Sequence, residues 1–206
     1  MRLSKIKHPS GGDVIFDRIS GFLFTEKEDN IEEYFLNSKF PWFYHSKTVQ
    51  SSEDTVFDDF GFHTHNFLLE GECQSPFMKD MLTLVDLGKF MKEYGLGDQL
   101  YNAHVNLFLQ RDRDVIPHPH IDFRNWKHTV ILYYVNDCDG DTIFYNKCEN
   151  DSLMDVEEWK RESPKKGDFV VFDGSIYHSP CCPVENRGRF TLNFDCKALD
   201  TKETVH

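Results

Sequence analysis

Residues 128–136 read HTVILYYVN, a short run of β-branched and aromatic side chains. Such runs, bounded by turn-forming residues, are typical of β-strands. Four further segments share this composition: NAHVNLFLQ at 102–110, DTIFYN at 141–146, GDFVVFDG at 167–174 and GRFTLNFDC at 188–196. We therefore expect a mainly β protein with an antiparallel sandwich or barrel core. Asp139-Gly140, between two of these runs, predicts a hairpin turn.

Before residue 100 the apolar pattern is mostly helical. TEKEDNIEEYFL at 25–36 begins with Thr25 and has Glu28 three positions on, the spacing of a capping box. A second, longer helix is expected from Ser75-Pro76 to Gly95, because proline favours the first turn and glycine the end of a helix. We expect both helices to pack outside the β core, and the terminal segments 1–12 and 200–206 to be loose.

The totals limit the class of protein. The chain has 206 residues, no repeat and no Gly/Ser linker, so we expect one domain: about 1–99 supplies helices, strands and substrate loops, and about 100–197 the core. A net charge of -12 disfavours nucleic acid and anionic membranes as partners. The N-terminus has no signal-like apolar run, and no stretch approaches about 18 apolar residues. We expect a cytoplasmic protein whose six cysteines are reduced.

HPHID at residues 118–122 suggests a metal site. In a strand His120 and Asp122 would share one face, roughly 6–7 Å apart along the backbone. His178, after the strand at 167–174, is the candidate third ligand. Two histidines and one carboxylate form the facial triad that binds non-haem Fe(II). His118 has the same parity as His120 and remains an alternative ligand, whereas we interpret His63 and His65 as packing or surface histidines.

Eleven residues after His178, Arg189 opens the strand RFTLNF. Thr191 lies on the same face of that strand as Arg189. A guanidinium beside a hydroxyl suits a carboxylate ligand, because it can form charge-assisted bidentate hydrogen bonds. Arg187 is a rival anchor, but Gly188 follows it and places it in a loop.

These residues carry a family resemblance. H-x-D, a distant histidine and then R-x-T resemble the motifs of the Fe(II)/2-oxoglutarate-dependent dioxygenase superfamily. TVILYYVND, GDTIFY and PKKGDFVVFDGSIYHSP resemble its prolyl 4-hydroxylase-like branch of bacterial or phage type. The similarity covers about residues 100–197. Two departures stand out: Asp139-Gly140-Asp141 replaces the glycine pair of many relatives, and Arg189 stands where animal collagen-type enzymes have lysine.

The resemblance implies a double-stranded β-helix, or jelly roll, in which His120, Asp122 and His178 bind Fe(II) and are the catalytic residues. It implies that Arg189 binds the distal carboxylate of 2-oxoglutarate. Thr191 and Tyr134 are plausible helpers, and Asn106, with Phe108, lines the same pocket. Tyr134 is preferred over Tyr133 because it shares a face with Leu132.

The implied activity is hydroxylation of an unactivated C–H bond with 2-oxoglutarate and O2, releasing succinate and CO2. A prolyl residue of a peptide or protein is the first choice of substrate, and ascorbate is a further candidate cofactor. Free amino acids and other small molecules remain alternatives, and the acidic charge disfavours nucleobases. Two other classes stay open: a non-catalytic jelly-roll binding protein, and a zinc-binding cupin-like hydrolase, which would give Arg189 no task.

Overall fold

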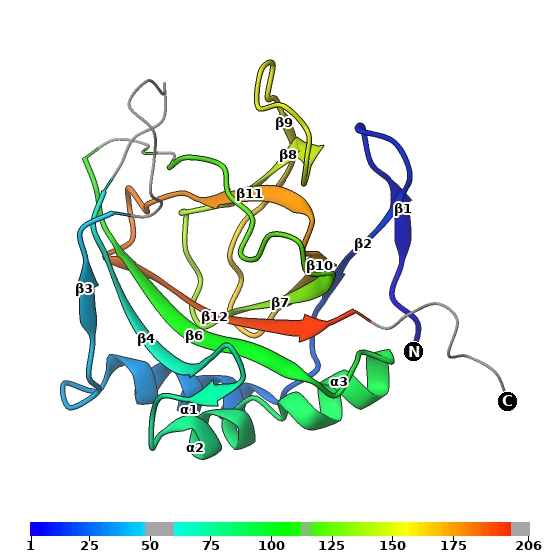
Figure 1. Cartoon of the computed structure of the whole chain (residues 1–206). Coiled ribbons are helices and arrows are strands. Elements are labelled where there is room, and N and C mark those ends of the chain that lie inside the picture. Colours follow the sequence, from blue (N-terminus) through cyan, green and yellow to red (C-terminus); the bar gives the residue numbers. More distant parts are fainter. Residues whose placement is uncertain (48–59, 113–114, 116, 199–206) are drawn as a thin grey trace, which may run out of the picture.

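A computed structural model describes residues 1–47, 60–112, 115 and 117–198 (Figure 1). Its strands are β1 Lys5–Lys7, β2 Asp13–Ile19, β3 Phe43–His45, β4 Phe62–Leu69, β5 Glu72–Cys73, β6 Leu100–Leu109, β7 His128–Tyr134, β8 Thr142–Cys148, β9 Glu158–Glu162, β10 Phe169–Asp173, β11 Ile176–Pro180 and β12 Gly188–Lys197. Its helices are α1 Thr25–Leu36, α2 Met78–Leu84 and α3 Leu87–Tyr94.

The strands form two antiparallel sheets. The major sheet runs β1-β2-β10-β7-β12-β6-β4-β3, with β5 paired to β4, and the minor sheet runs β11-β8-β9. In Figure 1 the minor sheet lies over the major one. The predicted mainly β class with a jelly-roll core is therefore confirmed.

The predicted hairpin at Asp139-Gly140 is wrong. β7 pairs with β10 and β12, whereas β8 pairs with β11 and β9, so residues 135–141 carry the chain from one sheet to the other. The carboxylate of Asp139 accepts hydrogen bonds from the backbone N–H groups of Val184, Glu185 and Asn186. Two crossing loops are thereby held together, which a local turn signal cannot reveal.

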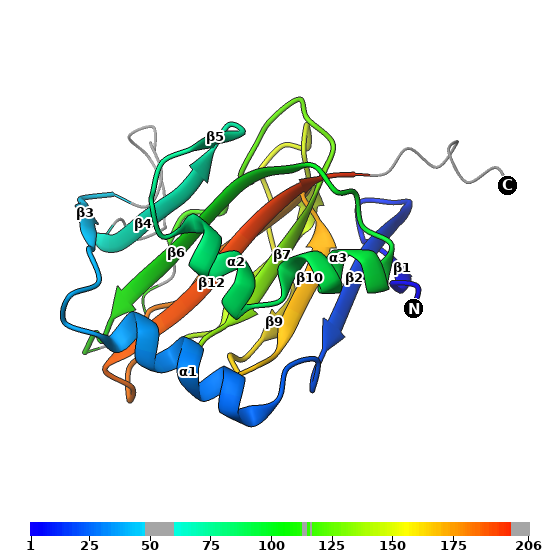
Figure 2. The ribbon, with the colours of Figure 1, turned by 90° about the horizontal axis from the view of Figure 1, so that it is seen from below.

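Helix α1 forms where its apolar spacing predicts, and Ile31 and Phe35 are buried. The capping box does not form: Phe24 is the N-cap residue, and no side chain caps the helix. In Figure 2 all three helices cross the outer face of the major sheet, away from the minor sheet. The helices therefore cover the outer face of the major sheet, and its inner face remains directed toward the minor sheet.

The second predicted helix is two helices. Asp86 has a left-handed backbone (φ 50°) and interrupts the segment between α2 and α3. Gly95 ends α3 with φ 66°, as the glycine stop signal predicts. The break lets Met81, Leu87 and Phe90 all reach the same core.

The expectation for the two termini has a mixed outcome. Residues 1–12 are not loose throughout, because Lys5–Lys7 pairs with β2 as an edge strand. Residues 200–206 lie outside the described part of the chain. Cys73, Cys138, Cys148 and Cys196 are free thiols, and no helix of the described residues is long and apolar enough to span a membrane.

The apolar core has two main layers. One lies between the helices and the outer face of the major sheet and includes Ile31, Phe67 and Phe90. The other lies between the sheets and includes Val130, Leu132 and Phe144. Because the apolar side chains of a strand must lie in one of these layers, their burial determines which side chains of the major sheet point toward the minor sheet.

Truncating Phe67 should show the contribution of the helix-side layer. Phe67 is fully buried, so Phe67→Ala should lower the free energy of unfolding by about 3–5 kcal/mol. Urea denaturation would measure the change. Phe24→Ala is the control, because the Phe24 side chain is 85% exposed; an equal loss in both variants would contradict this account of the core.

Candidate metal and 2-oxoglutarate site

The backbones of His120 and His178 lie side by side. Each backbone N–H donates to the carbonyl of the other at 2.9 Å, an isolated antiparallel bridge outside the named strands. The expected strand through 118–122 does not form, because Pro117 and Pro119 lack the N–H groups that a ladder needs. His178 belongs to its own strand, β11, rather than following β10 directly.

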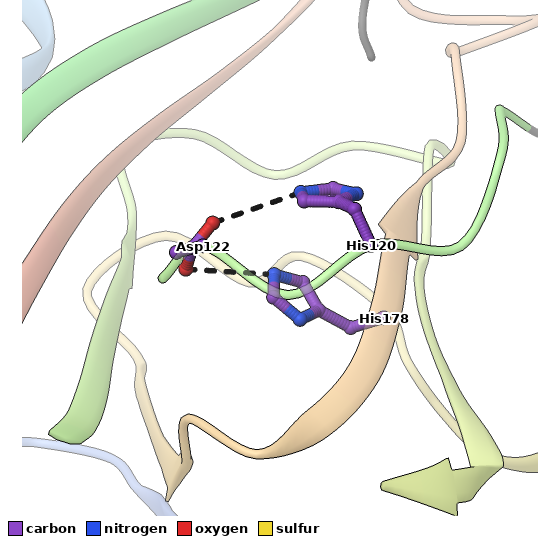
Figure 3. A group of neighbouring side chains, drawn as sticks. All are labelled: His120, Asp122 and His178. Carbon is purple, nitrogen blue, oxygen red and sulfur yellow. Dashed lines mark ion pairs between the residues drawn. The ribbon is translucent and has the colours of Figure 1, made fainter. Parts of the chain in front are cut away.

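The side chains of His120, Asp122 and His178 converge (Figure 3). His120 Nε2 lies 3.7 Å from Asp122 Oδ1, and His178 Nε2 lies 3.8 Å from Asp122 Oδ2. One donor atom from each residue lies within 4.8 Å of the other two. Two imidazole nitrogens and a carboxylate oxygen at this separation leave room for one metal ion between them.

The protonation of the cluster also suits a cation. His178 Nδ1 donates to the carbonyl of Ile176, so Nε2 carries the lone pair that faces Asp122. Burial lowers the pKa of His178 to about 4, so the ring is neutral near pH 7. Burial would raise the pKa of Asp122, but His178 and His120 outweigh it and lower that pKa. Asp122 Oδ2 is buried with no hydrogen-bond partner, as expected of a ligand atom.

Arg189, on β12, lines the same cavity as His120, Asp122 and His178. Its guanidinium donates to Thr142 Oγ1 at 2.6 Å, and Nε is buried with no partner. The residue is 2% exposed, and no carboxylate in the described ranges pairs with it. An unpaired buried guanidinium is costly, so this end of the cavity is built for an anion.

Tyr134 contacts both Thr142 and Arg189 at this end of the cavity. Its hydroxyl lies 2.8 Å from Thr142 Oγ1, which links it to Arg189, and the guanidinium carbon lies 5.9 Å from its ring centre. Burial raises the pKa of Tyr134 to about 12, against the opposing effect of Arg189. The phenol therefore stays protonated. Tyr133 packs in the helix-side layer, as its parity predicts.

A cavity of about 370 Å³ joins the two ends, within the range of about 300–1,000 Å³ typical of ligand sites. Its lining includes the three cluster residues, Arg189, Thr191, Asn106 and Phe108, and on the β3/β4 side His45, Phe62, Thr64, Asn66 and Leu69. Tyr134 touches this site through Thr142 rather than by lining it.

The alternative residues lie elsewhere. Arg187 is exposed in the loop before β12, and His118 is not part of the metal-type cluster. His65 is buried and bonded to Pro41 O and Ser75 Oγ, and His63 packs against Tyr44. The interpretation of His63 and His65 as packing histidines agrees with these contacts.

Several polar residues at the site have no signal in the sequence motifs. Asp195 is fully buried, and its carboxyl lies near Asp122 and 3.9 Å from His128 Nε2. Burial, and then the carboxylate of Asp122, raise the pKa of Asp195 well above its ordinary value. Asn102 donates to Asp195 and to His104, a further cavity residue. Burial lowers the pKa of His104 as well. Because side chains alternate along β12, the sequence could have predicted that Asp195 lies on the same face as Arg189. It could not have predicted that Asp195 lies close to Asp122.

Gly140 is needed where the crossing loop meets Arg189. A Cβ at this position would lie 2.7 Å from the Cys181 carbonyl oxygen and 3.0 Å from Arg189 Cδ. Gly140→Ala should therefore lower the free energy of unfolding by about 1–3 kcal/mol and weaken binding of an anion to Arg189. Gly88→Ala, in α3 with nothing within 4 Å of its Cβ, is the control; if both substitutions leave unfolding by urea unchanged, the close approach has no energetic role.

Comparison with known proteins places the fold. No protein-family model matches the chain, and no curated protein sequence does. A 2OG-Fe(II) oxygenase family oxidoreductase from Burkholderia pseudomallei superposes with a TM-score of 0.61 at 11% identity, covering 88% of this chain and 84% of that one. A prolyl hydroxylase from Trichoplax adhaerens, in complex with a hypoxia inducible factor oxygen degradation domain peptide fragment, gives 0.58 at 14%, covering 89% and 83%.

A third structure shows the range of this fold. The non-haem α-ketoglutarate-dependent epimerase SnoN from nogalamycin biosynthesis gives a TM-score of 0.61 at 11% identity, covering 92% of this chain and 82% of that one. The chain therefore has the jelly-roll fold of the 2OG-Fe(II) oxygenases, including prolyl hydroxylases. At these identities the likeness establishes the fold, and the reaction must be argued from the site.

Proposed function

We propose that the protein, as one domain over residues 1–206, is an Fe(II)- and 2-oxoglutarate-dependent dioxygenase that hydroxylates an unactivated C–H bond. The observation that carries this proposal is the pairing of two features in one cavity. A His-Asp-His cluster with a neutral His178 lies at one side, and a buried guanidinium with no carboxylate partner in the described structure lies at another. A binding protein with neither metal nor anion would gain nothing from either feature.

Each residue has a distinct task in this proposal. His120, Asp122 and His178 would hold the ferrous ion as catalytic ligands. Arg189 holds the distal carboxylate of 2-oxoglutarate, and Tyr134 keeps Thr142 in contact with the guanidinium. Thr191 and Asn106 line the cavity beside them. Because Arg189 is buried, water does not weaken its ion pair.

When bound, the iron supplies the oxidising chemistry: 2-oxoglutarate and O2 are consumed, succinate and CO2 are released, and one oxygen atom is inserted into the substrate C–H bond. The protein's own contribution is to orient the diacid and to keep water out. The apolar side chains of Phe108, Leu132 and Phe172 line the cavity and serve the second task.

A prolyl residue of a peptide or protein is the substrate that we propose. The prolyl hydroxylase neighbour is in complex with a peptide fragment, and the cavity of this chain is lined in part by residues of β3 and β4, beside which we place an extended peptide. Nucleic acid and membrane are not expected partners of a chain with net charge -12. Ascorbate would serve as a reductant that maintains ferrous iron.

Turnover with peptides tests this proposal. With Fe(II), ascorbate and O2, a set of proline-containing peptides should raise succinate formation, and mass spectrometry should show one peptide gaining an oxygen atom. Succinate formation coupled to a small molecule, with no peptide modified, would contradict the prolyl assignment. Absence of succinate formation with every substrate, from protein that binds neither Fe(II) nor 2-oxoglutarate, would contradict the oxygenase assignment itself.

A further inference from the structure

The inner face of the major sheet carries a row of neutral polar side chains beside the metal-type cluster. Asn66 on β4 is paired in register with His104 on β6, and His104 is paired in register with Asn193 on β12. All three residues line the cavity. In the register of β6 and β12, His104 lies opposite Asn193, four positions along β12 from Arg189, and Asn66 lies on β4, the neighbour of β6.

The orientation of the Asn102 side-chain amide assigns the ring proton of His104 to one nitrogen. The Asn102 amide N–H₂ donates to Asp195 Oδ2 at 3.1 Å and to His104 Nδ1 at 3.0 Å. Since Nδ1 accepts a hydrogen bond, the proton of the neutral ring lies on Nε2. Asn102 is 6% exposed and Asp195 fully buried, so this orientation is set inside the protein. His104, which lines the cavity, therefore carries an N–H donor at Nε2.

The charges around the cavity restrict what can enter it. Among the described residues that line it, Asp122 is the one carboxylate and Arg189 the one lysine or arginine side chain, and both have tasks in the proposed chemistry. Thr64 and Asn66 on β4 and His104 on β6 add polar groups; the first two are uncharged, and burial lowers the pKa of His104. A free amino acid would bring an ammonium and a carboxylate without partners, and burying unpaired charge is costly.

We propose that Asn66 and His104 form a subsite for a neutral amide group next to the carbon that is hydroxylated. His104 Nε2–H donates to the amide oxygen, and the Asn66 side chain, which both donates and accepts, pairs with the adjoining peptide group. This inference rests on the proposed function and names the residues by which the site would distinguish a peptide from a free amino acid. His104 and Asn66 act here as substrate-binding residues.

Two small probes test the preference. N-acetyl-L-prolinamide carries neutral amides, whereas L-proline carries two charges. Their dissociation constants would be measured by calorimetry on the anaerobic complex of the protein with Fe(II) and 2-oxoglutarate. The wild type should bind the amide at least about 10-fold more tightly, the size of one or two net hydrogen bonds. Equal binding, or no detectable binding of either probe, would overturn the subsite.

Variants of His104 assign the preference to its N–H group. His104→Leu keeps the bulk and should lose most of the preference, whereas His104→Gln places an amide N–H₂ near the position of Nε2 and should restore part of it. His63→Ala is the matched histidine control, because His63 alternates with cavity-lining Thr64 on β4 and should keep the full preference. A preference unchanged in His104→Leu would overturn the inference.

The tautomer gives a readout that needs neither metal nor turnover. ¹⁵N NMR of the metal-free protein should show His104 as the Nε2–H tautomer, and an Nδ1–H tautomer would overturn the inference. The proposed function is tested separately, since it fails when wild-type protein binds no Fe(II) and 2-oxoglutarate. The subsite fails alone when that complex forms but discriminates between the probes no better than His104→Leu does.

Discussion

Asp122→Ala should abolish turnover and weaken Fe(II) binding by at least about 100-fold. Loss of a residue that merely supports a metal ligand commonly costs 10–100-fold in affinity or activity, and Asp122 is the sole carboxylate of the His-Asp-His cluster. Without it, the cluster would keep His120 and His178 but no carboxylate ligand. Equilibrium dialysis of Fe(II) and succinate formation would measure the two losses.

This loss should occur without unfolding. In the metal-free protein Asp122 Oδ2 has no hydrogen-bond partner, so truncating this side chain should leave the fold intact. The thermal midpoint of metal-free Asp122→Ala should therefore stay within a few degrees of that of the wild type, as a change of about 1 kcal/mol would give. Asp13→Ala is the control, because Asp13 is an exposed partner of Lys7. Full Fe(II) binding by Asp122→Ala would contradict the assignment of this residue as a ligand.

Arg189→Leu should weaken 2-oxoglutarate binding by about 30-fold to a few thousandfold. Removing one partner of a buried charge pair costs about 2–5 kcal/mol, and every 1.4 kcal/mol is tenfold in affinity. Titration of the anaerobic Fe(II) protein with 2-oxoglutarate would measure the change. The variant should fold, because a leucine replaces a buried charge that lacks a carboxylate partner within the described structure.

Arg187→Leu is the matched control for this experiment. Arg187 lies two residues away on the same segment but is exposed in the loop, so its loss should leave the affinity within about twofold, as surface substitutions usually do. A larger effect at Arg187 than at Arg189 would move the anion site to the loop and contradict the placement of the diacid inside the jelly roll.

The sequence motifs pointed to the metal-type cluster and to Arg189, but not to the polar residues that contact them. His120, Asp122, His178 and Arg189 carry chemistry at recognisable spacings, and the structure brings all four to one cavity. Asp195 and His104 belong to no such motif, and Thr142 lies in GDTIFY without any local signal of its contact with Arg189, because these contacts depend on which strands are neighbours. Thr142 meets Arg189 across 47 positions of sequence, and no local pattern encodes that approach.

The fold shows the same division. The strand segments were recognisable from their composition, but Asp139-Gly140 resembles a hairpin turn whether its strands pair or separate into two sheets. The helix from residue 75 to 95 has one apolar pattern, and its interruption at Asp86 depends on a left-handed backbone that core packing selects. In place of the strand expected at 118–122, a single bridge joins His120 to His178, because Pro117 and Pro119 have no backbone N–H to donate.

The central claim is that three side chains hold one ferrous ion while a buried guanidinium holds the far end of a diacid. Anaerobic titration of the protein with Fe(II) and then 2-oxoglutarate tests it most directly. We predict a weak visible charge-transfer band that requires both additions, is lost in Asp122→Ala, and needs far more 2-oxoglutarate in Arg189→Leu. An unchanged spectrum in the wild type at saturating Fe(II) and 2-oxoglutarate would contradict the account.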